Sequence, residues 1–274
     1  MSTTRTPRGR LAAAGVAAFG VVLSGLLLPA VTRAAPVPAD RLRSAAAAPD
    51  FVREHRVIGH SVRGRKIHAW YRGDPDPRRV LLLLGQMHGD EKAGVRTARW
   101  VRRNVHPRPG TAVWVVPTMN PDGYVLNTRR NARHVDLNRN WPTSGWTSAG
   151  QGSETWGGPS PASEPETRAM LRFLQRVRPA YIASIHQPLA AIGRTAGHRI
   201  WQRRLSRNLG LPIRYLSIGT PSGLVSPTLT GWYNRHYGRA HVATTIEYRG
   251  RVTTRFVTRT AGLGIPRAAG LLRR

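Results

Sequence analysis

The chain has 274 residues, 40% of them hydrophobic, which is enough for one α/β domain with a substantial core or for two small domains. It contains no cysteine, which excludes disulfide bonds, thiolate metal ligands and a cysteine nucleophile. The 43 Lys and Arg residues against 13 Asp and Glu give a formal charge of +30. Such a charge fits either a solvated basic surface or attraction to a polyanion, namely nucleic acid, anionic lipid or an anionic cell-wall polymer.

The N-terminal segment, residues 1–34, predicts an export signal. Three arginines precede an uncharged apolar stretch at 11–28, and small residues at 32 and 34 have the spacing of a cleavage site. Cleavage would give a secreted or cell-wall-associated protein. The alternative is a membrane anchor that stays uncleaved, because the apolar stretch nearly reaches the length of a membrane span. Residues 35–50 are rich in Ala and Pro and predict a linker, which leaves 51–274 for the folded domain.

The pattern of hydrophobic residues in the folded part predicts strands that alternate with helices. Residues 56–73 alternate around a Ser-Val-Arg-Gly turn and predict a hairpin. Short apolar runs predict four further strands, at 80–84, 111–117, 180–185 and 241–246. Helical periodicity predicts helices at 91–104, 163–177 and 201–209, and a weak last helix broken by Gly264 and Pro266. For the helix at 163–177, we expect Ser163 as N-cap with Glu166 in a capping box.

Polar residues follow the predicted strands in a chemically suggestive way. His88 and Glu91 come after the first of the four, His186 ends the third and Glu247 ends the fourth. Open α/β sheets usually hold their chemistry at the carboxyl ends of strands. Zinc catalysis needs three protein ligands, which His88, Glu91 and His186 can supply, and a carboxylate base that is not a ligand, which Glu247 can supply.

These motifs together resemble the zinc metallocarboxypeptidases of the carboxypeptidase A type, over the range from Val57 to Arg249. Five segments carry the resemblance, at 58–65, 88–91, 120–140, 184–186 and 245–247. It implies a single catalytic domain at 51–274 in which helices flank a mixed, mostly parallel twisted sheet. It also implies one zinc ion and hydrolysis of a peptide bond next to a free C-terminal carboxylate.

The resemblance assigns further roles within the long loop at 120–160, which is rich in Gly, Pro, Asn and Ser. Arg129 would be the electrophile beside the scissile carbonyl, and Asn138 and Arg139 would hold the terminal carboxylate of the substrate. The physical chemistry agrees, because the guanidinium fork suits carboxylates and a fixed cation stabilises a developing oxyanion. Tryptophans at 141, 146 and 156 either line a pocket or pack within this loop.

Two departures from the family pattern stand out. His134 occupies a position where the family usually has Gly, so a positive φ there would carry some cost. The family's mobile tyrosine has no match, because Tyr233 lies too close to Glu247 in sequence. By family analogy, the pocket for the C-terminal side chain lies within 217–232, a stretch with no charged residue to indicate a preference.

Among subfamilies, the His-Gln-Pro-Leu segment that starts at His186 and the short chain most resemble bacterial murein tripeptide amidases, which cleave between D-glutamate and diaminopimelate. We therefore expect cell-wall peptides as substrates. The alternatives are a general secreted carboxypeptidase for all-L peptides, or a catalytically weak module that binds an anionic wall polymer. A deacylase of this fold is disfavoured by the Asp-Leu-Asn-Arg-Asn motif that starts at Asp136. Nucleic acid binding rests on charge alone, and an export signal argues against it.

Overall fold

The computed structural model describes residues 51–238 and 240–273. The expected export signal at 1–34 and linker at 35–50 lie outside these residues and stay predictions. None of the helices in the described part combines the length and the apolar character that crossing a bilayer requires.

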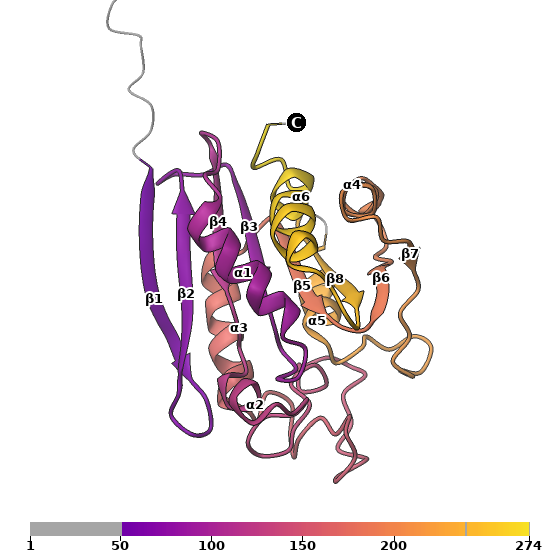
Figure 1. Cartoon of the computed structure of the whole chain (residues 1–274). Coiled ribbons are helices and arrows are strands. Elements are labelled where there is room, and N and C mark those ends of the chain that lie inside the picture. The colour runs from indigo at the N-terminus through magenta and orange to yellow at the C-terminus, as the bar shows by residue number, and fades with distance from the viewer. Residues whose placement is uncertain (1–50, 239, 274) are drawn as a thin grey trace, which may run out of the picture. The chain divides into compact units, whose positions relative to one another are not determined.

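The described residues form one eight-stranded sheet in the order β1-β2-β4-β3-β5-β8-β6-β7 (Figure 1). Its strands are β1 (Val52–His60), β2 (Lys66–Gly73), β3 (Arg79–Leu84), β4 (Thr111–Val116), β5 (Tyr181–His186), β6 (Leu189–Gly193), β7 (Ile213–Arg214) and β8 (Val242–Arg249). The four central strands β4, β3, β5 and β8 are parallel, whereas β2 and β6 run antiparallel to their inner neighbours. The predicted hairpin and the mixed, mostly parallel sheet are confirmed.

Helices cover both faces of the sheet, as Figure 1 shows. One face carries α1 (Ala93–Asn104), α4 (Arg199–Leu209) and α6 (Ala261–Ala268), and the other carries α3 (Pro165–Val177) and α5 (Leu229–Tyr237). The four leucines of β3 explain why both faces are buried. Leu81 and Leu83 pack into the first core, and Leu82 and Leu84 pack into the second, because successive side chains of a strand point to opposite faces.

Some local expectations differ from the structure. Helix α3 begins at Pro165 with Glu164 as N-cap, and the capping box expected from Ser163 and Glu166 does not form. The reason is tertiary, because the buried carboxylate of Glu166 accepts hydrogen bonds from Val62 N at 3.0 Å and Asn131 Nδ2 at 3.2 Å instead. Four elements were not predicted, namely α2 (Pro121–Leu126), β6, β7 and α5.

The end of the chain is more helical than expected. A π-helical turn, η2 (Phe256–Thr260), leads directly into α6, which continues through Gly264 and Pro266. The expected break at these two residues is therefore wrong. Ala261, Ile265 and Ala268 of this helix are buried in the first core, and this tertiary packing outweighs the weak helix propensity of Gly and Pro.

The connections of β3 create the crevice in which a site can form. The chain leaves β3 through α1 to β4 on one side, and later returns to β5 on the other side of β3. The segments that follow β3 and β5 therefore diverge at the carboxyl edge of the sheet, which is the usual ligand position in such folds. The turn into α1 is tight, since a Cβ on Gly94 would overlap the carbonyl oxygen of Gly85 and meet Ile185 Cγ2 at 2.8 Å.

This close approach gives a testable prediction for stability. Gly94→Ala adds a methyl group that has no space, so we expect it to lower the free energy of unfolding by about 1–3 kcal/mol, despite the better helix propensity of alanine. Gly250→Ala is the matched control, because its Cβ would meet only Pro188 Cβ, at 3.4 Å. Thermal or urea unfolding measures both variants. Equal stability of Gly94→Ala and the wild type would contradict the packing described.

Candidate active site

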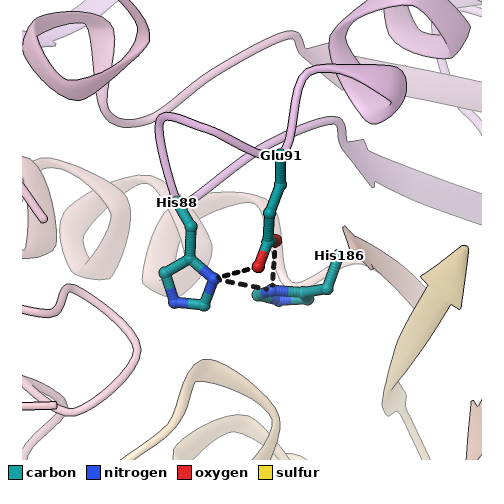
Figure 2. Close-up of side chains that lie close together, drawn as sticks. All are labelled: His88, Glu91 and His186. Atoms are coloured by element: carbon teal, nitrogen blue, oxygen red, sulfur yellow. Dashed lines mark hydrogen bonds and ion pairs between the residues drawn. The ribbon is translucent and has the colours of Figure 1, made fainter. Parts of the chain in front are cut away.

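Three side chains converge at the carboxyl edge of the sheet (Figure 2). His88 and Glu91 lie in the segment after β3, and His186 is the last residue of β5. Nδ1 of His88 lies 2.8 Å from Glu91 Oε1, and Nδ1 of His186 lies 3.1 Å from Glu91 Oε2. The two Nδ1 atoms are 3.3 Å apart, and all three side chains are buried. One ligand atom from each residue lies within 4.8 Å of the others, as a shared metal ion requires.

The remaining ring nitrogens have their own partners. His88 Nε2 lies 3.1 Å from Asp136 Oδ1, and His186 Nε2 lies 3.1 Å from Ser184 Oγ. Such outer partners fix the orientation of an imidazole and leave its other nitrogen for the metal. Two imidazoles and one carboxylate, with no thiolate, match the ligand set of a catalytic zinc site. The residues present therefore fit a single zinc ion.

The electrostatics of the cluster also favour a bound cation. Burial alone would lower the pKa of His88, but the carboxylates of Asp136 and Glu91 raise it to about 9. Burial alone would raise the pKa of Glu91, but His186 and His88 lower it to about 2. The protein thus holds two negative carboxylates around the imidazoles and favours positive charge at the centre of the cluster. A divalent cation satisfies that preference.

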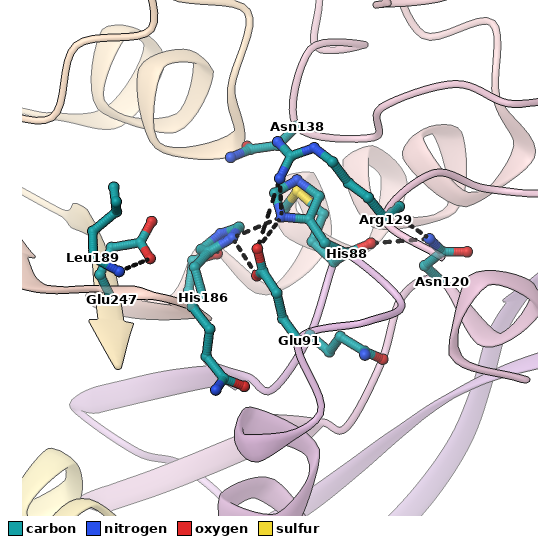
Figure 3. Close-up of polar contacts among 12 residues, drawn as sticks. His88, Glu91, Asn120, Arg129, Asn138, His186, Leu189 and Glu247 are labelled. Atoms are coloured by element: carbon teal, nitrogen blue, oxygen red, sulfur yellow. Dashed lines mark hydrogen bonds and ion pairs between the residues drawn. The ribbon is translucent and has the colours of Figure 1, made fainter. Parts of the chain in front are cut away.

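Asp136 connects the metal ligands to the long loop. Its buried carboxylate faces His88 and also accepts hydrogen bonds from Arg129 Nη2 at 2.7 Å and Arg129 Nε at 3.1 Å. Arg129 is thereby fixed with Nη1 aimed at the cluster, 3.3 Å from His88 Nδ1 and 3.7 Å from Glu91 Oε1 (Figure 3). Sequence reasoning gave Asp136 no role, although it is the first residue of the Asp-Leu-Asn-Arg-Asn motif that had been singled out.

Asn120 is a second residue whose part was missed. Its Oδ1 accepts from Gly123 N at 2.9 Å and so caps α2, while its Nδ2 donates to Met87 O at 3.1 Å and Arg129 O at 3.4 Å. One buried amide therefore ties the segment that carries His88 to the loop that carries Arg129. The Asn-Pro-Asp-Gly turn signal at this position could have indicated the cap, but not the two long-range partners.

Asn138 and Arg139 line the same cavity as the metal cluster, as the resemblance implied. Asn138 Oδ1 accepts from Leu229 N at 3.2 Å, at the start of α5, which leaves the Nδ2 donor of Asn138 for a ligand. Arg139 Nη1 donates to Asn138 O at 3.0 Å and lies 3.9 Å from Asp136 Oδ2. Burial lowers the pKa of Arg139, and the nearby Asp136 offsets this only in part. A carboxylate from outside would complete the pairing of this guanidinium.

Glu247 lies beside the metal cluster because of strand register. His186 of β5 and Glu247 of β8 are directly paired in adjacent parallel strands, so that both side chains leave the sheet on the same face. Glu247 is buried, and within the described residues its carboxylate accepts a single long hydrogen bond, to Oε2 from Leu189 N at 3.4 Å (Figure 3). Burial raises the pKa of Glu247. A carboxyl group with a raised pKa, close to a metal site but not among its ligands, suits proton transfer.

The predicted site residues all line one cavity of about 510 Å³. The tryptophans at 141, 146 and 156 do not line it. Trp146 and Trp156 donate to Gly157 O and Ser148 O, so packing within the loop is correct for these two. Trp141 instead packs in the second core against Trp232 of α5. Tyr233 is fully buried and its hydroxyl donates to Pro179 O at 2.6 Å, which agrees with giving it no role in proton transfer. His134 has a φ of 61°, so it does occupy the left-handed conformation that its position required.

Comparison with known proteins agrees with this geometry. The sequence model of the zinc carboxypeptidase family matches residues 41–193, which include the three metal ligands, Arg129, Asn138 and Arg139. Murein peptide amidase A of Escherichia coli (strain K12) is 36% identical over 146 residues. The match covers 49% of this chain and 59% of that protein, so the chain spans about three fifths of this curated relative.

Solved structures show the same fold. Murein-tripeptide amidase MpaA from Escherichia coli O157 superposes with a TM-score of 0.61 at 24% identity, covering 85% of this chain and 98% of that one. Carboxypeptidase A from Helicoverpa armigera superposes with a TM-score of 0.62 at 20% identity, covering 80% of this chain and 68% of that one. On the matching family model, the shared fold and the convergence of His88, Glu91 and His186, the chain belongs to the zinc carboxypeptidase family.

Proposed function

We propose that this protein hydrolyses the peptide bond that precedes a C-terminal residue with a free carboxylate, and that its substrates are peptides of the bacterial cell wall. The observation that carries the proposal is the placement of Glu247, which lies beside the His88–Glu91–His186 cluster without belonging to it. A binding module would need neither a complete ligand set nor a base in this position, so the geometry favours an enzyme.

Each residue has a part in the proposed reaction. His88, Glu91 and His186 would hold a zinc ion, which when bound would supply Lewis acidity to the scissile carbonyl and to the attacking water. Glu247 accepts the proton from the attacking water and then gives it to the leaving amine. Arg129, fixed by Asp136, directs Nη1 toward the carbonyl oxygen and stabilises the negative charge that develops on it. Arg139 and Asn138 hold the terminal carboxylate and so position the bond to be cleaved.

The murein substrate rests on three supports. The curated relatives include murein peptide amidases at 36% and 33% identity, although each match covers less than two thirds of the relative. The chain carries a formal charge of +30, which concentrates anionic fragments near the cavity. The export signal proposed for residues 1–34 would bring the protein to the compartment that contains wall peptides. We also propose that an anionic wall polymer attracts the mature protein through the same charge.

The metal site gives the first prediction. His186→Ala removes one of three ligands, so we expect loss of stoichiometric zinc and of activity together. Asp136→Asn keeps the fold but weakens the orientation of His88, and should lower zinc affinity about 10- to 100-fold. Competition with a chromophoric chelator measures the affinity. Asp90→Asn, an exposed acid in the same segment, is the matched control and should bind zinc normally. Unchanged affinity in His186→Ala would refute the ligand assignment.

The base gives the second prediction. Glu247→Gln keeps the shape of the side chain but cannot accept a proton, so kcat should fall about 10²- to 10⁴-fold. Zinc content and the unfolding curve should stay as in the wild type, which separates loss of the base from loss of the site. Turnover near the wild-type rate in a zinc-loaded Glu247→Gln preparation would assign proton transfer to another residue.

The substrate gives the third prediction. At fixed ionic strength, kcat/KM for L-Ala-γ-D-Glu-diaminopimelate should exceed that for an all-L peptide with an apolar C-terminal residue. A clear preference for the all-L peptide would replace the murein proposal by a general carboxypeptidase. Arg139→Ala should raise KM for both peptides, because the partner of the terminal carboxylate is lost. A KM that does not change for either peptide would place the terminal carboxylate elsewhere.

A further inference from the structure

A groove lies between α1 and the hairpin β1–β2, which Figure 1 shows beside this helix at one edge of the sheet. Alternate residues of β2 point to opposite faces, and Ile67 and Ala69 are buried in the second core. His68 and Trp70 therefore point to the side of the sheet that α1 covers. Trp70 pairs across the hairpin with His55, and these three rings lie on the floor of the groove with their centroids between 4.9 and 5.3 Å apart.

Cations line this groove almost without counter-ions. Two cavities of about 420 and 240 Å³ make it up, and both are lined by Trp70, Arg102 and Arg103. The further cations that line one cavity or the other are Arg53, Arg65, Lys66, Arg72 and Arg99. Glu54 is the only carboxylate that lines either cavity in the described part of the chain, and it is already paired with Arg56. The groove therefore has a large excess of positive charge.

The crowding of these like charges destabilises the fold locally. Arg53 and Arg72 lie directly opposite each other in β1 and β2, and like charges in such a pair repel. Arg72 is buried, and its Nε has no hydrogen-bond partner among the described residues. Burial lowers the pKa of Arg72, and Arg53 and Arg102 lower it further. Burial, Arg103 and Arg99 likewise lower the pKa of Arg102. An anion bound in the groove would relieve this repulsion.

Aromatic rings hold several of the cations in place. The guanidinium of Arg102 lies over Trp70, with Cζ 4.4 Å from the ring centroid. Lys92 and Arg99 lie over the ring of Tyr124 in α2, at 5.4 and 5.5 Å from its centroid. Within residues 51–238 and 240–273, no carboxylate forms an ion pair with any of these three cations. The rings thus order the cations without neutralising them, which lowers the entropic cost of binding an anion.

We propose that this groove binds a linear phosphodiester polymer of the bacterial cell wall and so holds the protein at the wall. The inference rests on the proposed function for this location, whereas the charge of the groove is independent of it. A tetrahedral phosphodiester directs its two free oxygens differently, so it can accept from α1 and from the hairpin at once. The two oxygens of a planar carboxylate instead match a single guanidinium fork. Lys92 directly follows Glu91, so the groove reaches the edge of the sheet that carries the candidate active site.

The same contacts argue against nucleic acid as the occupant. Proteins that bind single strands offer aromatic rings on which the bases stack. Here the rings of Trp70 and Tyr124 already contact cations of the protein, and His55 and His68 also stack against Trp70. The groove therefore presents positive charge and no free platform for a base.

The test measures binding of the zinc-loaded protein to end-labelled poly(glycerol phosphate) by fluorescence anisotropy, at several salt concentrations. A triple variant with Arg99→Gln, Arg102→Gln and Arg103→Gln should bind about tenfold more weakly, because three exposed or half-exposed ion pairs with the polymer are lost. The slope of log affinity against log salt concentration should become shallower by roughly two, since fewer counter-ions are released. The unfolding curve and the zinc content check that the variant is folded.

Helix α4 offers matched controls that change the net charge equally. Its exposed arginines outside both cavities, replaced together by glutamine, should leave polymer binding and the salt slope as in the wild type; they are Arg203, Arg204 and Arg207. A second pair reverses one charge in the last turn of each helix. Arg103→Glu in α1 should weaken polymer binding, whereas Arg207→Glu in α4 should not.

Two outcomes would overturn the inference. Equal losses in the α1 and α4 variants would mean that binding follows net charge alone. Equal or tighter binding of single-stranded DNA or poly-L-glutamate with the same number of charges, through the same arginines, would assign the groove to a different polymer. Polymer binding does not depend on cleavage, so a protein that binds poly(glycerol phosphate) through the groove but cleaves no peptide would refute only the proposed reaction.

Discussion

One buried carboxylate organises the candidate site. Asp136 is inaccessible to solvent, yet it faces His88, two nitrogens of Arg129 and the backbone N–H of Asn138 at 2.8 Å. Burial alone would raise its pKa, but the neighbouring cations hold the pKa of Asp136 well below its usual range. A buried charge is tolerated only when such partners surround it. The orientation of the metal ligand His88, of the proposed electrophile Arg129 and of the loop proposed to bind the terminal carboxylate therefore depends on a single side chain.

The sheet supplies the frame on which this interaction acts. The parallel neighbours β3, β5 and β8 deliver His88, His186 and Glu247 to one edge, and the register of β5 with β8 sets the last two side by side. The loop that carries Asp136 comes from the other side of β3, after β4. Because the strand order reverses at β3, functional side chains from segments far apart in sequence meet at one edge of the sheet. The reversal also leaves a crevice between these segments in which a peptide can lie.

The sequence allowed six of the eight strands and most of the candidate site to be predicted, because apolar runs that end in His or Glu are a local pattern. His88, Glu91, His186 and Glu247 were identified in this way. Asp136 and Asn120 were not, since their roles depend on partners distant in sequence. Helix α3 shows the same limit, because a long-range contact with Val62 and Asn131 takes Glu166 away from the expected cap.

The large separation of the metal ligands along the sequence has a consequence for the stability of the folded chain. Glu91 and His186 are 95 residues apart, and a shared ion joins them as a crosslink would. The chain has no cysteine and hence no covalent crosslink, although its expected destination lies outside the cell. A disulfide stays closed in the unfolded chain, whereas a bound ion would leave its ligands on unfolding and would stabilise only the folded state. Resistance to unfolding would therefore depend on the free metal concentration, as it does for no disulfide.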